Sequence, residues 1–160
     1  MVSQDQFLNY VVNHNSNDFI DKLPNIGIPI KASSYLICFE MVGSEMVFQQ
    51  QGLHNGDLLI GKLAPQTDLK GMIGQVLCLV TNSGISTKRL DSVNPRHLQL
   101  KSDDPNYPIE DLLSENIIQI WQVLGVFSEK INPPNYLESR ILKLEQAIDK
   151  LSTLPESNNN

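Results

Sequence analysis

The sequence has few basic residues, and this shortage excludes one large class of function. Lys and Arg together number 12 against 18 Asp and Glu, which gives a net charge of -6. Gripping a phosphate backbone requires a clustered Lys/Arg surface, and here the basic residues are scattered along the chain. We therefore do not expect this chain itself to bind nucleic acid, and the acidic excess is typical of a surface that favours solubility.

Long hydrophobic runs are also missing. The nearest candidate, Val76–Val80, is far shorter than a membrane-spanning segment. The first residues, Met1–Gln6, show no basic start followed by an apolar run, so no secretory signal is predicted. These features predict a cytoplasmic protein without contact to a membrane.

Cysteine and metal-ligand patterns are sparse. Cys38 and Cys78 each lie inside an apolar, strand-like run, which favours two buried free thiols in a reducing cytoplasm over a disulfide or a metal pair. His14, His54 and His97 lie far apart, with no Cys or carboxylate at ligand spacing. No metal site and no cofactor are predicted.

The 160 residues suit one domain with a substantial core plus an appendage. Residues 1–34 are polar and Asn-rich and contain Pro24 and Pro29, so they are predicted to form an extended N-terminal arm. Residues 35–131 form the predicted domain and 132–154 a helix, while 155–160 are predicted to be a disordered tail.

The predicted domain consists of short apolar runs separated by turn signals. Asn82–Gly84 reads as the turn of a hairpin, and no helical pattern of 10–15 residues separates the runs. The pattern therefore predicts an all-β, mostly antiparallel domain. The expected strands are 35–42, 57–63, 75–81, 85–90, 98–101 and 117–127.

The C-terminal segment has a different periodicity. Apolar residues recur there at intervals of four, three, four and three, as in a heptad seam with Ile at the a positions and Leu at the d positions. This combination favours a parallel two-stranded coiled coil, and therefore a homodimer; the alternative is an amphipathic helix folded onto its own domain. The predicted dimerisation residues are Leu137, Ile141, Leu144, Ile148 and Leu151.

Four motifs follow one another in a specific order. They are Gly43-Ser44-Glu45-Met46, Gly56-Asp57-Leu58-Leu59-Ile60-Gly61, Thr87-Lys88-Arg89 and Ser102-Asp103-Asp104-Pro105-Asn106-Tyr107-Pro108. From about residue 8 to residue 128 the chain resembles the LexA and phage-repressor self-cleaving peptidases, which carry a Gly-Asp-Ser-Met box and a Val-Lys-Arg strand. The resemblance implies the antiparallel β-ribbon fold that this family shares with the membrane-anchored signal peptidases.

In that family a serine attacks a peptide bond of its own chain, and a buried, uncharged lysine takes the serine proton. The resemblance assigns Lys88 to the base position, Glu45 to the nucleophile position and Leu8-Asn9 to a vestigial cleavage site. Glutamate is a poor nucleophile toward an amide, and its charge favours the lysine ammonium. Glu45 and Lys88 are therefore expected to form an ion pair that locks an inactive site.

The resemblance thus implies a non-catalytic regulatory and dimerisation domain of a transcription regulator, whose DNA contacts are made through a helix-turn-helix domain absent from this chain. Two alternatives remain open. The first is an active serine-lysine autopeptidase of the SOS type that uses the adjacent Ser44 with Lys88, which requires a bulge in the box. The second is a peptide-binding module whose vestigial cleft holds its own arm or a partner strand.

Overall fold

A computed structural model describes residues 1–27, 35–130, 141 and 143–148. The chain divides into two compact units, Met1–Lys130 and Ile131–Asn160, which are considered separately. The candidate site lies entirely within the first unit.

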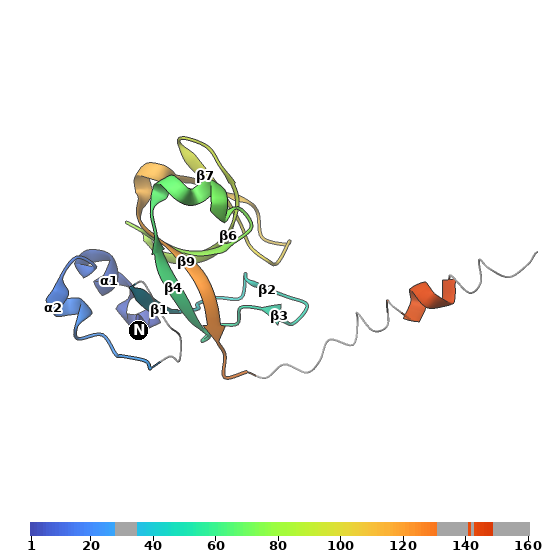
Figure 1. Ribbon diagram of the computed structural model, residues 1–160, viewed down its shortest axis with the longest axis horizontal. Helices are drawn as coiled ribbons and strands as arrows, with labels where there is room; N and C mark the ends of the chain where they lie inside the picture. Colours follow the sequence, from blue (N-terminus) through green and yellow to red (C-terminus); the bar gives the residue numbers. More distant parts are fainter. Residues whose placement is uncertain (28–34, 131–140, 142, 149–160) are drawn as a thin grey trace, which may run out of the picture. The chain divides into compact units, whose positions relative to one another are not determined.

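The first unit is built on a seven-stranded sheet with the order β1-β4-β9-β5-β6-β7-β8 (Figure 1). Every neighbouring pair of strands is antiparallel, so the predicted mostly antiparallel β architecture is confirmed. The strands are β1 (Leu36–Glu40), β4 (Leu58–Ala64), β5 (Val76–Thr81), β6 (Gly84–Val93), β7 (His97–Lys101), β8 (Glu110–Leu113) and β9 (Ile117–Phe127).

The sheet is buried on both faces at its centre, and the period-2 alternation of β5 shows how. Cys78 and Val80 point into one apolar cluster, together with Trp121 and Phe39, whereas Leu77 and Leu79 point into a second cluster on the other face. The continuous apolar run of β5 is typical of a strand that is covered on both sides. The predicted hairpin at Asn82–Gly84 is confirmed, because Thr81 pairs with Gly84.

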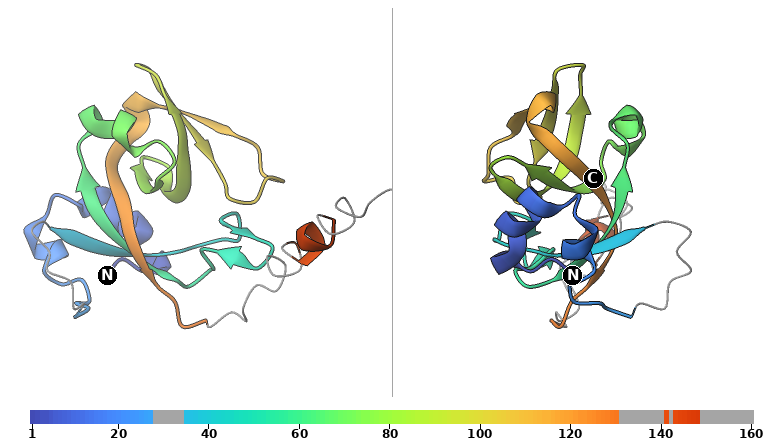
Figure 2. Two further views of the ribbon diagram at one scale, coloured as in Figure 1. Left: turned by 45° about the vertical axis from the view of Figure 1, so that its right-hand side comes forward. Right: turned by 90° about the vertical axis from the view of Figure 1, so that its left-hand side faces the viewer.

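The N-terminal segment is not the extended arm that the sequence predicted. It forms η1 (Gln4–Gln6), α1 (Phe7–Asn13) and α2 (Asn17–Ile20), which lie beside β1 (Figure 2). Phe7, Tyr10 and Val11 have the i, i+3, i+4 spacing of an amphipathic helix and pack on the core, and Tyr10 is 1% exposed. The expectation was wrong because Pro24 and Pro29 follow these helices and do not interrupt them.

Backbone pairing also holds the first residues on the sheet. The Val2 N–H donates to the Cys38 carbonyl at 2.7 Å, and the Val2 carbonyl accepts from the Glu40 N–H at 3.0 Å. Val2 is fully buried. The N-terminal segment therefore adds to the free edge of β1 and closes one side of the core.

Three short strands were not predicted. β2 (Val47–Phe48) and β3 (Gln51–Gly52) form a small hairpin of their own, and β8 lies at the edge of the main sheet. Their residues are largely exposed, so they lack the apolar alternation that identifies longer strands. The remaining loops contain η2 (Gln66–Met72) and η3 (Ser114–Asn116).

In the second unit, residues 141 and 143–148 are helical, as predicted. Ile141, Leu144 and Ile148 are exposed by 53%, 63% and 63%. Leu137, Leu151 and the tail 155–160 lie outside the described residues. Among the residues that are described, no helix has both the length and the apolar character needed to cross a bilayer.

Gly52 tests how tightly the β2–β3 hairpin holds the loop at Glu45. Its φ is +103°, and a Cβ at this position would lie 2.1 Å from the Met46 carbonyl oxygen. We expect Gly52→Ala to lower the free energy of unfolding by about 1–3 kcal/mol, because it adds backbone strain to a clash that no side chain can relieve. Chemical denaturation gives this value.

The matched control is Gly71→Ala, since a Cβ at Gly71 meets open space. It should change stability by no more than about 1 kcal/mol. Equal losses for the two variants would contradict a specific close approach at Gly52.

Candidate functional site

The site is centred on Lys88, a cation buried within β6. Lys88 is 3% exposed and pairs in register with Leu77 of β5, so it lies on the same face of the sheet as Leu77 and Leu90. A lysine is rarely buried unless its charge has partners, since desolvation of an unpaired ammonium costs several kcal/mol. The surroundings of its Nζ atom therefore decide what the site can do.

Three oxygen atoms surround the Lys88 Nζ atom. Glu110 Oε1 lies at 2.7 Å and Glu45 Oε1 at 3.3 Å, and Nζ donates a hydrogen bond to Ser102 Oγ at 3.1 Å. The predicted contact between Lys88 and Glu45 is confirmed. These three oxygen atoms match the three N–H donors of a lysine ammonium.

Glu45 reaches Lys88 because a tight loop between β1 and β2 is fixed on both sides. Gly43 has φ +95°, and its N–H donates to Asn55 Oδ1 at 3.0 Å. The Glu45 carbonyl accepts from the Asp104 N–H at 3.0 Å, and the next side chain, Met46, is fully buried. The box residues therefore position the Glu45 carboxylate through backbone contacts and one apolar anchor.

Ser102 and Glu110 arrive from the β7–β8 hairpin. Arg89 of β6 pairs with Lys101 of β7, and one further step of this register brings Ser102 opposite Lys88. Leu100 pairs with Glu110, so the Glu110 side chain lies on the same face as Leu100. The strand register alone thus brings Ser102 and Glu110 to the buried lysine.

A second ion pair holds the turn of this hairpin. Arg89 Nε and Nη2 donate to Asp103 Oδ1 and Oδ2, each at 2.7 Å, and Nη1 donates to the Gly74 carbonyl at 2.7 Å. The hydrogen bond to Asp103 raises the pKa of the Arg89 guanidinium, and burial opposes this effect. Arg89 neighbours Lys88 but faces the opposite side of β6, so it fixes the turn without entering the site.

Ser44, the alternative nucleophile, is not brought to the lysine. Its side chain is exposed, and its Oγ lies 3.4 Å from the Tyr107 hydroxyl. The oxygen atoms within bonding distance of Lys88 Nζ belong to Glu45, Ser102 and Glu110. The register of the box therefore presents Glu45, and not Ser44, to the base position.

The residues predicted to be a vestigial cleavage site lie near the site but in a helix. Leu8 and Asn9 belong to α1, and Leu8 is 73% exposed. Leu8 and Glu45 line the same cavity of about 350 Å³, together with the beginning of β6. A peptide bond within a helical turn is not presented as an extended strand, so residues 8 and 9 are close to the site without occupying it as a substrate.

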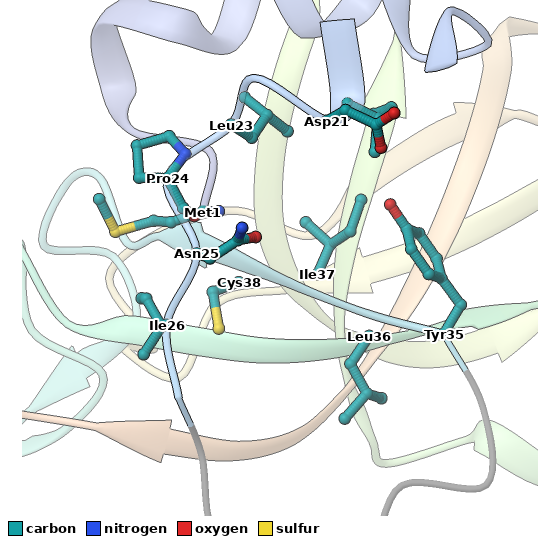
Figure 3. A pocket seen from close by; sticks show the side chains of 11 residues that line it. Met1, Asp21, Leu23, Pro24, Asn25, Ile26, Tyr35, Leu36, Ile37 and Cys38 are labelled. Carbon is teal, nitrogen blue, oxygen red and sulfur yellow. Dashed lines mark hydrogen bonds between the residues drawn. The ribbon is translucent and has the colours of Figure 1, made fainter. Parts of the chain in front are cut away.

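A separate cavity of about 360 Å³ lies beside β1 (Figure 3). Leu23, Pro24 and Ile26 form one wall, and Tyr35 to Cys38 form the other. Burial raises the pKa of the Tyr35 hydroxyl, and the charge of Asp21 adds to this effect. The lining is mixed in polarity and does not include the lysine site.

The cysteines fulfil their expected structural role. Cys38 and Cys78 are both free and buried. Complete burial raises the pKa of the Cys78 thiol to about 12, only partly offset by its contact with Thr87. Within the described ranges, no three His, Cys, Asp or Glu side chains form a group that would hold a metal ion.

Sequence reasoning missed one residue of the site and underused another. Glu110 was given no role, because β8 carries no recognisable strand pattern and the residue lies far along the chain from Glu45. Ser102 begins the fourth motif, but the motif does not predict its hydrogen bond with Lys88. The strand register between β6, β7 and β8 is the signal that identifies both residues, and it requires the folded sheet.

No protein-family model matches the sequence, and no curated protein matches it either. The motifs and the geometry of the lysine site are therefore the features that point to a function.

Glu45→Ala tests the ion pair. Lys88 keeps Glu110 and Ser102 in this variant, so we expect a loss of about 1 kcal/mol in unfolding free energy, the cost of one charged partner at a buried cation. Thermal and denaturant unfolding measure the difference.

Ser44→Ala is the matched control, because Ser44 is exposed and adjacent in sequence. Its stability should stay within about 0.5 kcal/mol of the unaltered protein. A larger loss for Ser44→Ala than for Glu45→Ala would argue against the ion pair as the interaction that matters.

Proposed function

We propose that this chain is a non-catalytic, LexA/phage-repressor-like regulatory and dimerisation domain of a transcription regulator. The observation that carries the proposal is the carboxylate of Glu45 at 3.3 Å from the buried Lys88 ammonium. The resemblance assigns a nucleophilic serine to that position. The antiparallel β architecture is consistent with the fold that the resemblance implies.

The chemistry of a serine-lysine dyad supports this proposal. The lysine must offer a lone pair to the serine hydroxyl, and the serine must then attack a carbonyl carbon. In this site two carboxylates favour the ammonium, and the nearest hydroxyl group, that of Ser102, belongs to a side chain only 7% exposed. A substrate has no access to that hydroxyl, so the site stabilises the fold and performs no acyl transfer.

Dimerisation is the second part of the proposal. The exposed Ile141, Leu144 and Ile148 form an apolar stripe on the described part of the C-terminal helix. Water disfavours such a stripe on a monomer, and its heptad spacing suits a second copy of the same helix. Under this proposal, DNA contact is made by a separate helix-turn-helix domain. The free, buried cysteines support a reducing, cytoplasmic location.

A second candidate function is peptide binding at the cavity beside Glu45. Gly84–Arg89 of β6 pair with β5 on one edge, whereas the ladder with β7 includes β6 residues only from Arg89 onward. Backbone groups on the other edge of residues 84–88 are thus oriented toward the cavity that Leu8 and Val42 also line. This arrangement favours addition of an extended strand, from the chain itself or from a partner.

The first functional prediction concerns self-cleavage. The purified protein, held at mildly alkaline pH, should keep its full 18.0 kDa mass, because the base position is occupied by an ion-paired ammonium. Intact-mass spectrometry over a time course measures this. Fragments that appear in the unaltered protein and disappear in Ser44→Ala would instead establish an active peptidase that uses Ser44.

The second concerns the oligomer. The protein should sediment as a dimer at concentrations on the order of tens of micromolar, because the heptad seam favours a two-stranded coiled coil. Ile141→Asp with Ile148→Asp places like charges across the seam, so the apparent mass should fall toward 18.0 kDa.

A matched control changes two exposed positions outside the seam, Lys143→Asp with Gln146→Asp. This variant should remain a dimer by analytical ultracentrifugation. If the unaltered chain is already a monomer under the same conditions, the dimer proposal fails.

A further inference from the structure

We propose that two carboxylates on separate segments each prevent Lys88 from acting as a general base. A serine restored at position 45 is therefore not sufficient to make Lys88 a base. The second carboxylate, Glu110, has no counterpart among the motifs of the sequence. This inference rests on the proposed function, since it explains how the same site is kept inactive.

The first argument is the match between donors and acceptors. A lysine ammonium carries three N–H donors and no acceptor. Three acceptors, Glu45 Oε1, Ser102 Oγ and Glu110 Oε1, lie at 3.3, 3.1 and 2.7 Å from Nζ. The three acceptors match the three N–H donors of the protonated side chain, whereas an uncharged amine has only two N–H donors, and of the three oxygens only the Ser102 hydroxyl could donate to its lone pair.

The second argument is that the two carboxylates come from separate elements. Glu45 lies on the loop after β1, held by the Asp104 N–H, and Glu110 begins the edge strand β8. Substitution of one glutamate therefore does not remove the segment that carries the other. Glu110 makes the shorter contact, at 2.7 Å, to a side chain that is 4% exposed, so it remains a strong partner after Glu45 is removed.

The other ionic groups on the strands around Lys88 do not compensate for this negative charge. Arg89 is paired with Asp103 at 2.7 Å, and Lys101 is paired with Asp91 at 2.7 Å. Glu45 and Glu110 are therefore the carboxylates that act directly on Lys88. A hydroxyl at position 45 would face an ammonium that is still held by Glu110 and Ser102.

The experiment compares Glu45→Ser with the double variant Glu45→Ser/Glu110→Gln. Both are treated with a fluorophosphonate, a reagent that phosphonylates activated serine hydroxyls, and intact mass reports labelling between pH 7 and 9. We expect the double variant to react at least about 100-fold faster, the low end of what a general base contributes. Adding Lys88→Met to the double variant should abolish the gain.

The matched control is Glu45→Ser/Asp111→Asn. Asp111 is the exposed neighbour of Glu110 on the same strand, so this variant removes one charge nearby without touching Lys88. It should react like Glu45→Ser alone. Equal labelling rates for Glu45→Ser and Glu45→Ser/Glu110→Gln would overturn the proposal, as would an equal gain from Asp111→Asn.

A second measurement keeps the test independent of reagent access. The nitrogen chemical shift of the Lys88 side chain at pH 8, measured by NMR, should be that of an ammonium in the unaltered protein and in Glu45→Ser, and should move toward that of an amine in the double variant. Conversion to an amine in Glu45→Ser alone would refute the inference. Labelling of Ser44 in the unaltered protein would instead contradict the proposed function.

Discussion

Burial of the Lys88 ammonium is the constraint on which the arrangement of the site depends. A cation that is 3% exposed requires oxygen partners, and these come from three separate parts of the chain. The loop after β1 supplies Glu45, the end of β7 supplies Ser102, and β8 supplies Glu110. The buried lysine is therefore a contact that these three segments share.

The sheet surrounds the contacts of Lys88 with apolar side chains. β5 is apolar on both faces, and Leu77 is the cross-strand neighbour of Lys88. On the other face, the Tyr10 hydroxyl donates to Gln119 Oε1 at 2.9 Å and attaches helix α1 to β9, and the Trp121 Nε1–H donates to the same oxygen at 3.1 Å within β9. Low local polarity strengthens each of these interactions and makes an unpaired group costly.

The N-terminal segment lines part of the cavity beside Glu45, which the resemblance alone did not imply. It was expected to carry an extended, vestigial cleavage strand, but α1 places Leu8 at the rim of the cavity that Glu45 lines. An apolar helix face covers the core, and residues 8 and 9 stay within regular hydrogen bonding. Position 45 thus carries a carboxylate in contact with Lys88, and residues 8 and 9 are helical and not extended.

The long apolar strands, the hairpin at Asn82–Gly84, the buried thiols and the pairing of Glu45 with Lys88 can all be predicted from the amino-acid sequence. These follow from local periodicity and from motifs whose order is read directly along the chain. The helices before residue 21, the edge strand β8 and the role of Glu110 were decided only by the tertiary structure. Short exposed segments carry too few apolar residues to show a period, and strand register, which brings residues distant in sequence together, exists only once the sheet has formed.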